Sequence, residues 1–294
     1  MASFDPRITP AREDLAAEWL RDRVAARRYA AGTPHSVIRD GASLHFAPDA
    51  GARQESQLVY GETFTVLETK DGWCWGQNNN DGYVGYVAAA ALSPELPEVN
   101  HWVCALQTHL YTEPDLKQPV VGLISFSSQV EVVDYQDGFS RIASGHWLHS
   151  KHLVERDYTT HDLVGTAIKF IGVPYLWGGR SAFGVDCSAL VQFALTFAGI
   201  EAPRDSDLQE SAVGQPVPMA DPHDFSHVAD GDLVFFPGHV GLYVGGWRFL
   251  HANAYDMQVS LQRFSDVLDR ADAEGAGVTS IRRVLELAPE DGAP

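Results

Sequence analysis

Cys187 and His239, 52 residues apart, are the pair in this 294-residue chain best suited to do chemistry together. Cys187 lies in an Asp-Cys-Ser run, where a glycine-rich segment meets an apolar stretch that predicts a helix over 188–198. Unpaired N–H groups and the helix dipole at such a first turn favour the thiolate, the nucleophilic form of cysteine. His239 follows Pro237-Gly238 at the start of a predicted strand, which suits a general base. The pattern predicts nucleophilic catalysis by a thiol.

The other two cysteines, Cys74 and Cys104, lie in strand patterns beside tryptophans, and we interpret them as structural. A sparse, odd set of cysteines argues against a disulfide framework and for a reducing compartment. The first residues form no basic-then-apolar signal segment, and no run of about 18 apolar residues occurs. The expected location is the cytoplasm, with no membrane partner.

His251 is the candidate third member of the site, 12 residues after His239 in the next predicted strand. If the hairpin turn centres on Gly245, the two histidines oppose each other on one face. His251 would then hold the second ring nitrogen of His239 and fix its tautomer. A loop of Gly245-Gly246 alone would place them on opposite faces, and chance proximity is the remaining alternative.

Two further assignments complete the chemistry. An oxyanion site needs aimed donors, for which the Cys187 N–H and the Tyr175 hydroxyl are candidates, although Tyr175 also suits a core position beside a buried Trp177. A metal site made of Cys187, His239 and His251 is an alternative that the sequence disfavours, because Cys-x-x-Cys and His-Glu-x-x-His spacings are absent. We predict neither a metal nor another cofactor.

The elements that position these residues fall into a multidomain order. Residues 9–31 predict a helix, capped by Thr9 and ended by Gly32. Two copies of a repeat of about 55 residues follow, with short alternating strands and Asp-Gly turns, and predict two small all-β barrels. From about residue 158, helices over 162–171 and 188–198 precede strands over 232–236, 239–244 and 248–253, an α+β arrangement. The predicted parts are 1–34 (helix), 35–96 and 97–156 (barrels) and 157–294 (α+β domain).

Composition limits the partners. Hydrophobic residues make up 45% of the chain, as in a globular protein. The chain has 21 Lys and Arg against 39 Asp and Glu, a net charge of −18. Such a surface repels nucleic acid and anionic membranes. The oligomeric state is not encoded in any pattern that we find.

The spaced motifs of residues 158–285 resemble the NlpC-type cell-wall cysteine peptidases, papain-like enzymes that cleave peptidoglycan peptides. The motifs are Tyr175-x-Trp-Gly-Gly, Asp186-Cys187-Ser188, Gly231-Asp232-Leu-Val-Phe, Gly238-His239-Val-Gly and Leu250-His251-Ala. One departure is Ala189, where the family usually has glycine; alanine is also small and forms helices better. The barrels resemble bacterial SH3-like domains, and the whole order is similar to γ-D-glutamyl-L-diamino-acid endopeptidases.

The resemblance implies a pocket that recognises the free amino end of the peptide L-Ala-γ-D-Glu-diamino acid. It places Arg204-Asp205-Ser206 there, with Asp205 on the ammonium group and Ser206 on the D-Glu carboxylate, and adds Asp186 and Ser188 beside the cysteine. From the first barrel it adds Glu62 and Tyr83. The residues alone leave two alternatives open, a helix cap over 205–207 and a barrel-core position for Tyr83.

The function implied by the resemblance is hydrolysis of the γ-D-glutamyl to diamino-acid bond in free muropeptides during cell-wall recycling. A pocket that neutralises a free ammonium would reject stems whose L-Ala amine is blocked, because buried carboxylates would stay unpaired. The expected partner is therefore a muropeptide with an unblocked N-terminal L-Ala. The alternatives are a papain-like amidase or acyltransferase with another substrate, and a cell-wall peptide binding module whose third domain is inert.

Overall fold

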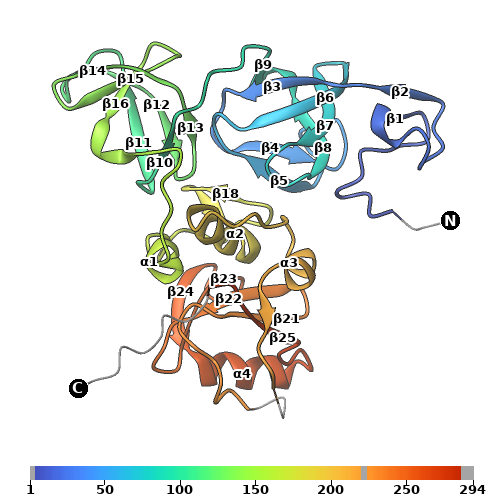
Figure 1. The fold of residues 1–294 in the computed structure, drawn as a ribbon, viewed down its shortest axis with the longest axis vertical. Coiled ribbons are helices and arrows are strands. Elements are labelled where there is room, and N and C mark those ends of the chain that lie inside the picture. Colours follow the sequence, from blue (N-terminus) through green and yellow to red (C-terminus); the bar gives the residue numbers. More distant parts are fainter. Residues whose placement is uncertain (1–3, 220–223, 286–294) are drawn as a thin grey trace. The chain divides into compact units, whose positions relative to one another are not determined.

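Short strands with alternating burial build the first barrel, as the repeat predicts. In the computed structural model, which describes residues 4–219 and 224–285, its sheet has the order β5-β4-β8-β7-β6-β3-β9 (Figure 1). The two-residue turn Asp71-Gly72 joins β6 to β7, and both residues have positive φ, as a type I′ hairpin turn requires. Leu44, Phe64 and Val87 lie at the centre of its core. The strands are β3 Thr33–Val37, β4 Ala42–His45, β5 Gln54–Leu58, β6 Thr63–Lys70, β7 Trp73–Asn78, β8 Val84–Ala88 and β9 Leu92–Ser93, with a 3₁₀ turn η2 Ala89–Ala91.

The second copy repeats this plan with two smaller sheets, β12-β11-β16-β15-β14 and β13-β10-β17. Asp137-Gly138 forms the equivalent turn between β14 and β15, again with positive φ at both residues. Val103, Ile124 and Leu148 lie in its core. The strands are β10 His101–Val103, β11 Gln107–Tyr111, β12 Val120–Ser125, β13 Gln129–Val130, β14 Val132–Gln136, β15 Phe139–Ile142, β16 Trp147–His149 and β17 Leu153–Glu155, with η3 Ser150–His152.

The helix predicted over 9–31 is wrong. The chain there forms two short parallel strands, β1 Leu15–Ala17 and β2 Arg28–Ala30, and a 3₁₀ turn, η1 Glu18–Leu20. Leu15 and Leu20 pack against Trp75 of the first barrel, over whose ring Arg12 lies at 4.2 Å. Helix propensities differ by only about a few tenths of a kcal/mol per residue. The packing of this segment on the barrel is therefore enough to override them.

The α+β part carries one antiparallel sheet of order β20-β25-β21-β22-β23-β24. In Figure 1 this sheet lies between α2 and α4. Helix α2 is buried along almost its whole length and packs on β22 and β23, while α4 buries Phe264 and Val267. The elements are α1 Leu163–Ile168, β18 Arg180–Ser181, β19 Gly184–Val185, α2 Cys187–Phe197, α3 Ser206–Ala212, β20 Gln215–Pro216, β21 Leu233–Phe236, β22 His239–Tyr243, β23 Arg248–Asn253, β24 Gln258–Arg263, α4 Phe264–Ala273 and β25 Ser280–Arg283.

The segment 177–184 leaves the α+β part and joins the barrels. The chain divides into two compact units, 1–158 with 177–184 and 159–176 with 185–294. Gln54 Nε2 donates to the Trp177 carbonyl at 2.9 Å, and the Ala182 N–H donates to Ser125 Oγ at 2.9 Å. Both barrels thus hold the segment that leads to Asp186 and Cys187. Among the described residues, no helix combines the length and apolar character needed to cross a membrane.

Candidate active site

Asp186 determines where the cysteine helix begins. It occupies the N-cap of α2, and its Oδ1 accepts the Ala189 N–H at 2.9 Å. Such a cap satisfies one of the donors that a helix start leaves unpaired. Cys187 is therefore the first residue of the helix, with its side chain buried at 7% exposure. Ser188 Oγ donates to the same Asp186 oxygen at 3.3 Å.

Arg204 is the buried cation that neutralises this cap. Its Nη1 and Nη2 donate to the two oxygens of Asp186 at 2.9 and 2.6 Å, and Nη1 also donates to Ser188 Oγ at 2.8 Å. A bidentate, charge-assisted pair of this kind has a fixed geometry. It ties the segment before α3 to the first turn of α2. No spacing rule in the sequence reveals this pairing.

His239 and His251 meet across the β22–β23 hairpin. His239 Nε2 and His251 Nδ1 are 2.8 Å apart, and the ring centroids are 5.0 Å apart. The hairpin takes neither of the two registers considered from the sequence: Leu242 pairs with Leu250 and Tyr243 with Phe249, so the turn centres on Gly246. The histidines are consequently diagonal neighbours on one face of the sheet instead of directly opposed. Aromatic side chains are long enough to make contact across such a diagonal.

Gly241 gives this diagonal contact its space. A Cβ at position 241 would lie 2.5 Å from Phe249 Cζ and 2.8 Å from His251 Cβ. Position 241 thus has no room for a side chain, and glycine is required there. This explains the second glycine of the Gly238-His239-Val-Gly motif in physical terms.

The Cys187 sulfur lies against the backbone of β22. The N–H of Val240, the residue after His239, hydrogen-bonds the thiol group and lowers the pKa of Cys187, as the Ser188 N–H also does. Helix α2 packs directly on β22, which brings the cysteine to the histidine end of that strand. Because His251 engages Nε2 of His239, Nδ1 is the nitrogen that can accept the thiol proton.

Burial dominates the electrostatics of the pair. Burial, followed by the Asp186 charge, raises the pKa of Cys187 to about 12, against the lowering by Val240, Arg204 and Ser188. Burial also lowers the pKa of His239 to about 4. Both shifts favour the uncharged forms, a neutral thiol and a neutral imidazole. Burial thus opposes the thiolate that the start of the helix favours.

Tyr175 lies near the cysteine with its hydroxyl protonated. Burial, followed by the charges of Cys187 and Asp186, raises its pKa to about 12. Its backbone bridges to Val185, two residues before the nucleophile. A neutral hydroxyl at this place can donate a hydrogen bond to developing negative charge. Trp177, expected to be buried, is 61% exposed.

The residues assigned to the peptide pocket of the α+β part begin α3. Asp205 is half-buried at the N-cap position but makes no capping hydrogen bond with its side chain, which weighs against the cap alternative. Ser206 is buried. Asp186 and Ser188 lie beside Cys187 but bind Arg204. Contact of these four residues with a substrate stays a prediction.

The two barrel residues lie in different surroundings. Glu62 is buried, and its carboxylate accepts from Arg180 at 2.9 and 3.0 Å and from the Val59 N–H at 2.9 Å. Burial raises the pKa of Glu62, and Arg180 counteracts this. Tyr83 belongs to the core cluster of the first barrel, which favours the core alternative. Arg180 was not foreseen, because nothing local marks it as the partner of a residue 118 positions away.

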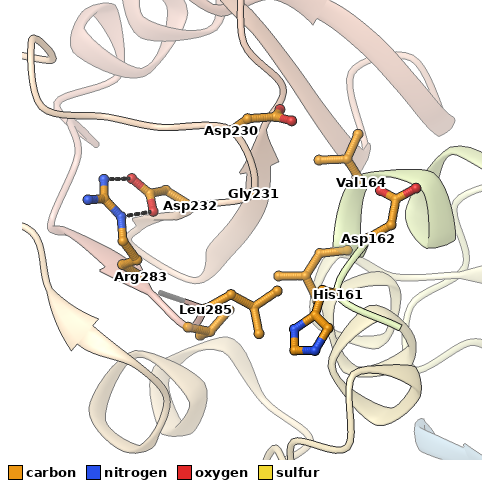
Figure 2. Close-up of a pocket in the computed structure, with 10 residues that line it drawn as sticks. His161, Asp162, Val164, Asp230, Gly231, Asp232, Arg283 and Leu285 are labelled. Carbon is orange, nitrogen blue, oxygen red and sulfur yellow. Dashed lines mark hydrogen bonds and ion pairs between the residues drawn. The ribbon is translucent and has the colours of Figure 1, made fainter. Parts of the chain in front are cut away.

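A separate pocket of the α+β part is lined by the residues drawn in Figure 2, none of which belongs to the cysteine site. There Asp232 accepts from Arg283 at 2.8 and 2.7 Å, as Figure 2 shows, and from the Ala229 N–H. This pair joins β21 to β25 and explains the Gly231-Asp232 motif as structural. Within the described part of the chain, no three His, Cys, Asp or Glu side chains are grouped to hold a metal ion.

Known proteins share both parts. Residues 172–270 match the NlpC/P60 family and residues 44–92 the bacterial dipeptidyl-peptidase Sh3 domain. The γ-D-glutamyl-L-lysine dipeptidyl-peptidase of Bacillus subtilis (strain 168) is 41% identical over 220 residues, which cover 67% of this chain and 72% of that protein. A protein of the same name from Bacillus cereus (strain ATCC 10987 / NRS 248) is 28% identical over 239 residues, or 70% and 69% of the two chains.

A solved structure has the same fold. The crystal structure of an NlpC/P60 family protein from Bacillus cereus ATCC 10987 aligns with a TM-score of 0.70 at 21% identity, covering 86% of this chain and 100% of that one. The matched range, residues 172–270, includes the cysteine and both histidines described above. The chain belongs to the NlpC/P60 family of cysteine peptidases.

Proposed function

We propose that this peptidase hydrolyses the bond between γ-D-Glu and the diamino acid of free peptidoglycan stem peptides that carry an unblocked L-Ala. The observation that carries the proposal is the buried Cys187 at the start of α2, beside the β22 end where His239 meets His251 at 2.8 Å. The names of the two Bacillus relatives give the bond.

The reaction follows from the geometry. Cys187 Sγ attacks the amide carbonyl while its proton passes to His239 Nδ1, and the oxyanion accepts hydrogen bonds from the Cys187 N–H and the Tyr175 hydroxyl. The C–N bond breaks as His239 returns that proton to the leaving amine. Water, deprotonated by His239, then attacks the thioester, releasing the L-Ala-D-Glu acid and restoring the thiol.

Selection for a free amine is the finer part of the proposal. Asp205, half-buried directly before α3, is the carboxylate that we assign to the substrate ammonium, with buried Ser206 beside it. Glu62 is already paired with Arg180, so we assign it a supporting role. A peptide with a blocked amine leaves the carboxylate unpaired, which costs binding energy.

A role in recycling and a cytoplasmic location complete the proposal. Free stem peptides with an exposed L-Ala arise when the glycan has been removed, so the enzyme acts after that cleavage. Cys74, Cys104 and Cys187 form no disulfide, which supports a reducing compartment.

The test is hydrolysis of L-Ala-γ-D-Glu-meso-diaminopimelate and its lysine counterpart, each with and without N-acetylation, read by mass spectrometry. We expect cleavage of the free-amine peptides only, and none by Cys187→Ala. Cys104→Ala is the matched control and should retain activity. Cleavage of acetylated peptides would contradict the amine selection. Binding without cleavage, with a thiol that resists iodoacetamide, would favour the binding-module alternative.

A further inference from the structure

The second ring nitrogen of His251 is a buried polar atom without a hydrogen bond. His251 is 3% exposed, and its Nε2 has no partner of normal geometry among the described residues. Its Nδ1 is engaged by His239. Buried polar atoms are rarely left unsatisfied in native proteins, and an exception calls for a functional reason.

The two possible tautomers of His251 have opposite consequences for the reaction. For His239 Nδ1 to accept a proton, its Nε2 must carry hydrogen and donate to Nδ1 of His251, so His251 is protonated on Nε2. In the other tautomer, His251 Nδ1–H donates to His239 Nε2, which moves the His239 hydrogen to Nδ1. That form of His239 cannot take the thiol proton. A group that accepts from His251 Nε2–H therefore selects the reactive arrangement.

Gln262 lies on β24 at the position to be that acceptor. His251 pairs with Ser260 and Phe249 with Gln262 across β23 and β24, so Gln262 is the diagonal neighbour of His251 on the same face. Burial lowers the pKa of His251, and a hydrogen bond with the Gln262 side chain partly counteracts this by raising it. A group that accepts a hydrogen bond from histidine is expected to raise its pKa in this way.

The orientation of the Gln262 amide is determined by its other partners. Nε2 donates to Ser260 Oγ at 3.3 Å and to the Asp256 carboxylate, while the Arg270 guanidinium of α4 donates to Oε1. The amide nitrogen is thus on the carboxylate side, and the oxygen is the atom left for His251. A carbonyl oxygen has two lone pairs, so Oε1 can accept from Arg270 and His251 together.

We propose that Gln262 is a positioning residue: its Oε1 accepts from His251 Nε2–H and so holds His251 and His239 in the tautomers that let His239 deprotonate Cys187. The charged or titratable groups facing His251 are His239 on β22, Asp256 in the β23–β24 turn and Arg270 on α4. This inference rests on the catalytic roles proposed for Cys187, His239 and His251.

The test compares Gln262→Met with Gln258→Met, which makes the same change at an exposed position of the same strand. We expect Gln262→Met to lower kcat by about tenfold with little change in KM, the effect of one lost hydrogen bond in the transition state. The rate of iodoacetamide alkylation of Cys187 should fall in parallel. Gln258→Met should behave as the wild type in both assays.

A measurement of the His251 tautomer distinguishes a positioning role of Gln262 from a general loss of structure in the variant. Nitrogen-15 NMR of histidine-labelled protein should show His251 protonated on Nε2 in the wild type and a mixed or reversed tautomer in Gln262→Met. Gln262→Glu keeps an acceptor, so it should retain most of kcat. Its added negative charge should move the acid limb of the kcat/KM profile to higher pH, because it favours protonated histidine.

Two outcomes would overturn the proposal: wild-type kcat and tautomer in Gln262→Met, or lost activity with the His251 tautomer unchanged. Failure of the proposed function gives a different result. If the wild type cleaves none of the stem peptides, the alkylation and NMR measurements still decide whether Gln262 controls the tautomer, because neither needs a substrate.

Discussion

At the scale of single residues, burial favours the uncharged forms of Cys187 and His239. A buried thiol and a buried imidazole both avoid the cost of desolvating a charge, which is why the pKa of Cys187 rises and that of His239 falls. The charge separation then has to occur during attack, with His251 and the Val240 N–H already in place. This predicts an unusual pH dependence.

We expect kcat/KM to fall on the acid side with a midpoint near pH 4. The base must be unprotonated, so activity is lost as the pH drops through the pKa of His239, which is lowered to about 4. On the alkaline side the thiol stays protonated until about pH 12, the value to which burial raises its pKa. The profile of peptide hydrolysis and of iodoacetamide alkylation measures both limbs. An acid limb near the ordinary histidine value would show instead a resting ion pair.

Arg204 is the residue whose loss should affect stability most. Replacing it by Met leaves Asp186 buried without its cation, which typically costs about 3–5 kcal/mol. Urea unfolding should show that loss, and the start of α2 should become less ordered. Arg248→Met, at an exposed position of β23, is the control and should change stability little. Equal stability of the two variants would mean that the cap does not depend on the pair.

At the scale of elements, the β22–β23 hairpin decides whether the site exists. A shift of one residue in pairing would move His251 to the other side of the sheet from His239. The turn contains three successive residues with positive φ, Gly245, Gly246 and Trp247, and centres the pairing on Gly246. The close approach at Gly241 then allows the rings to meet.

Gly241→Ala should therefore damage both stability and activity. Its Cβ would meet Phe249 Cζ at 2.5 Å and His251 Cβ at 2.8 Å, so the strands must separate. Overpacking of this kind costs about 1–3 kcal/mol. We expect a lower unfolding midpoint and a kcat reduced more than KM changes. Gly51→Ala, where the nearest atom lies at 3.5 Å, is the control; identical behaviour of the two variants would contradict this account.

At the scale of the whole molecule, the barrels hold part of the peptidase sequence. The segment 177–184 belongs to the compact unit of the barrels, and it ends two residues before the cap Asp186. Arg180 is its anchor: buried, bound to both oxygens of Glu62 and to the Gln57 carbonyl at 3.0 Å. The segment that precedes Asp186 in the sequence is therefore held within the unit of the barrels.

A chain reduced to residues 159–294 should consequently lose activity, because segment 177–184 would lack the partners that hold it. In the full chain, Arg180→Met leaves Glu62 and Asp81 buried without that cation and should lower stability by about 3–5 kcal/mol. Peptide hydrolysis and urea unfolding measure the two effects. Full activity of the shortened chain would favour the alternative of an amidase that does not use the barrels.

Local sequence determined the chemistry and most elements. Asp186-Cys187-Ser188 at a helix start, His239 at a strand start and the Asp-Gly turns of the barrels are short-range signals, because caps, turns and periodicity depend on neighbours in sequence. The prediction of a helix over 9–31 was wrong because apolar residues of this segment pack against barrel residues that are distant in the sequence.

Only the tertiary structure decided how those residues work together. The pairing of Asp186 with Arg204, of Glu62 with Arg180 and of His251 with its neighbours on β24 joins residues far apart in sequence, whose contacts depend on strand register and on packing between elements. The pKa shifts of Cys187 and His239 likewise come mainly from burial, a property of the folded chain and not of a motif.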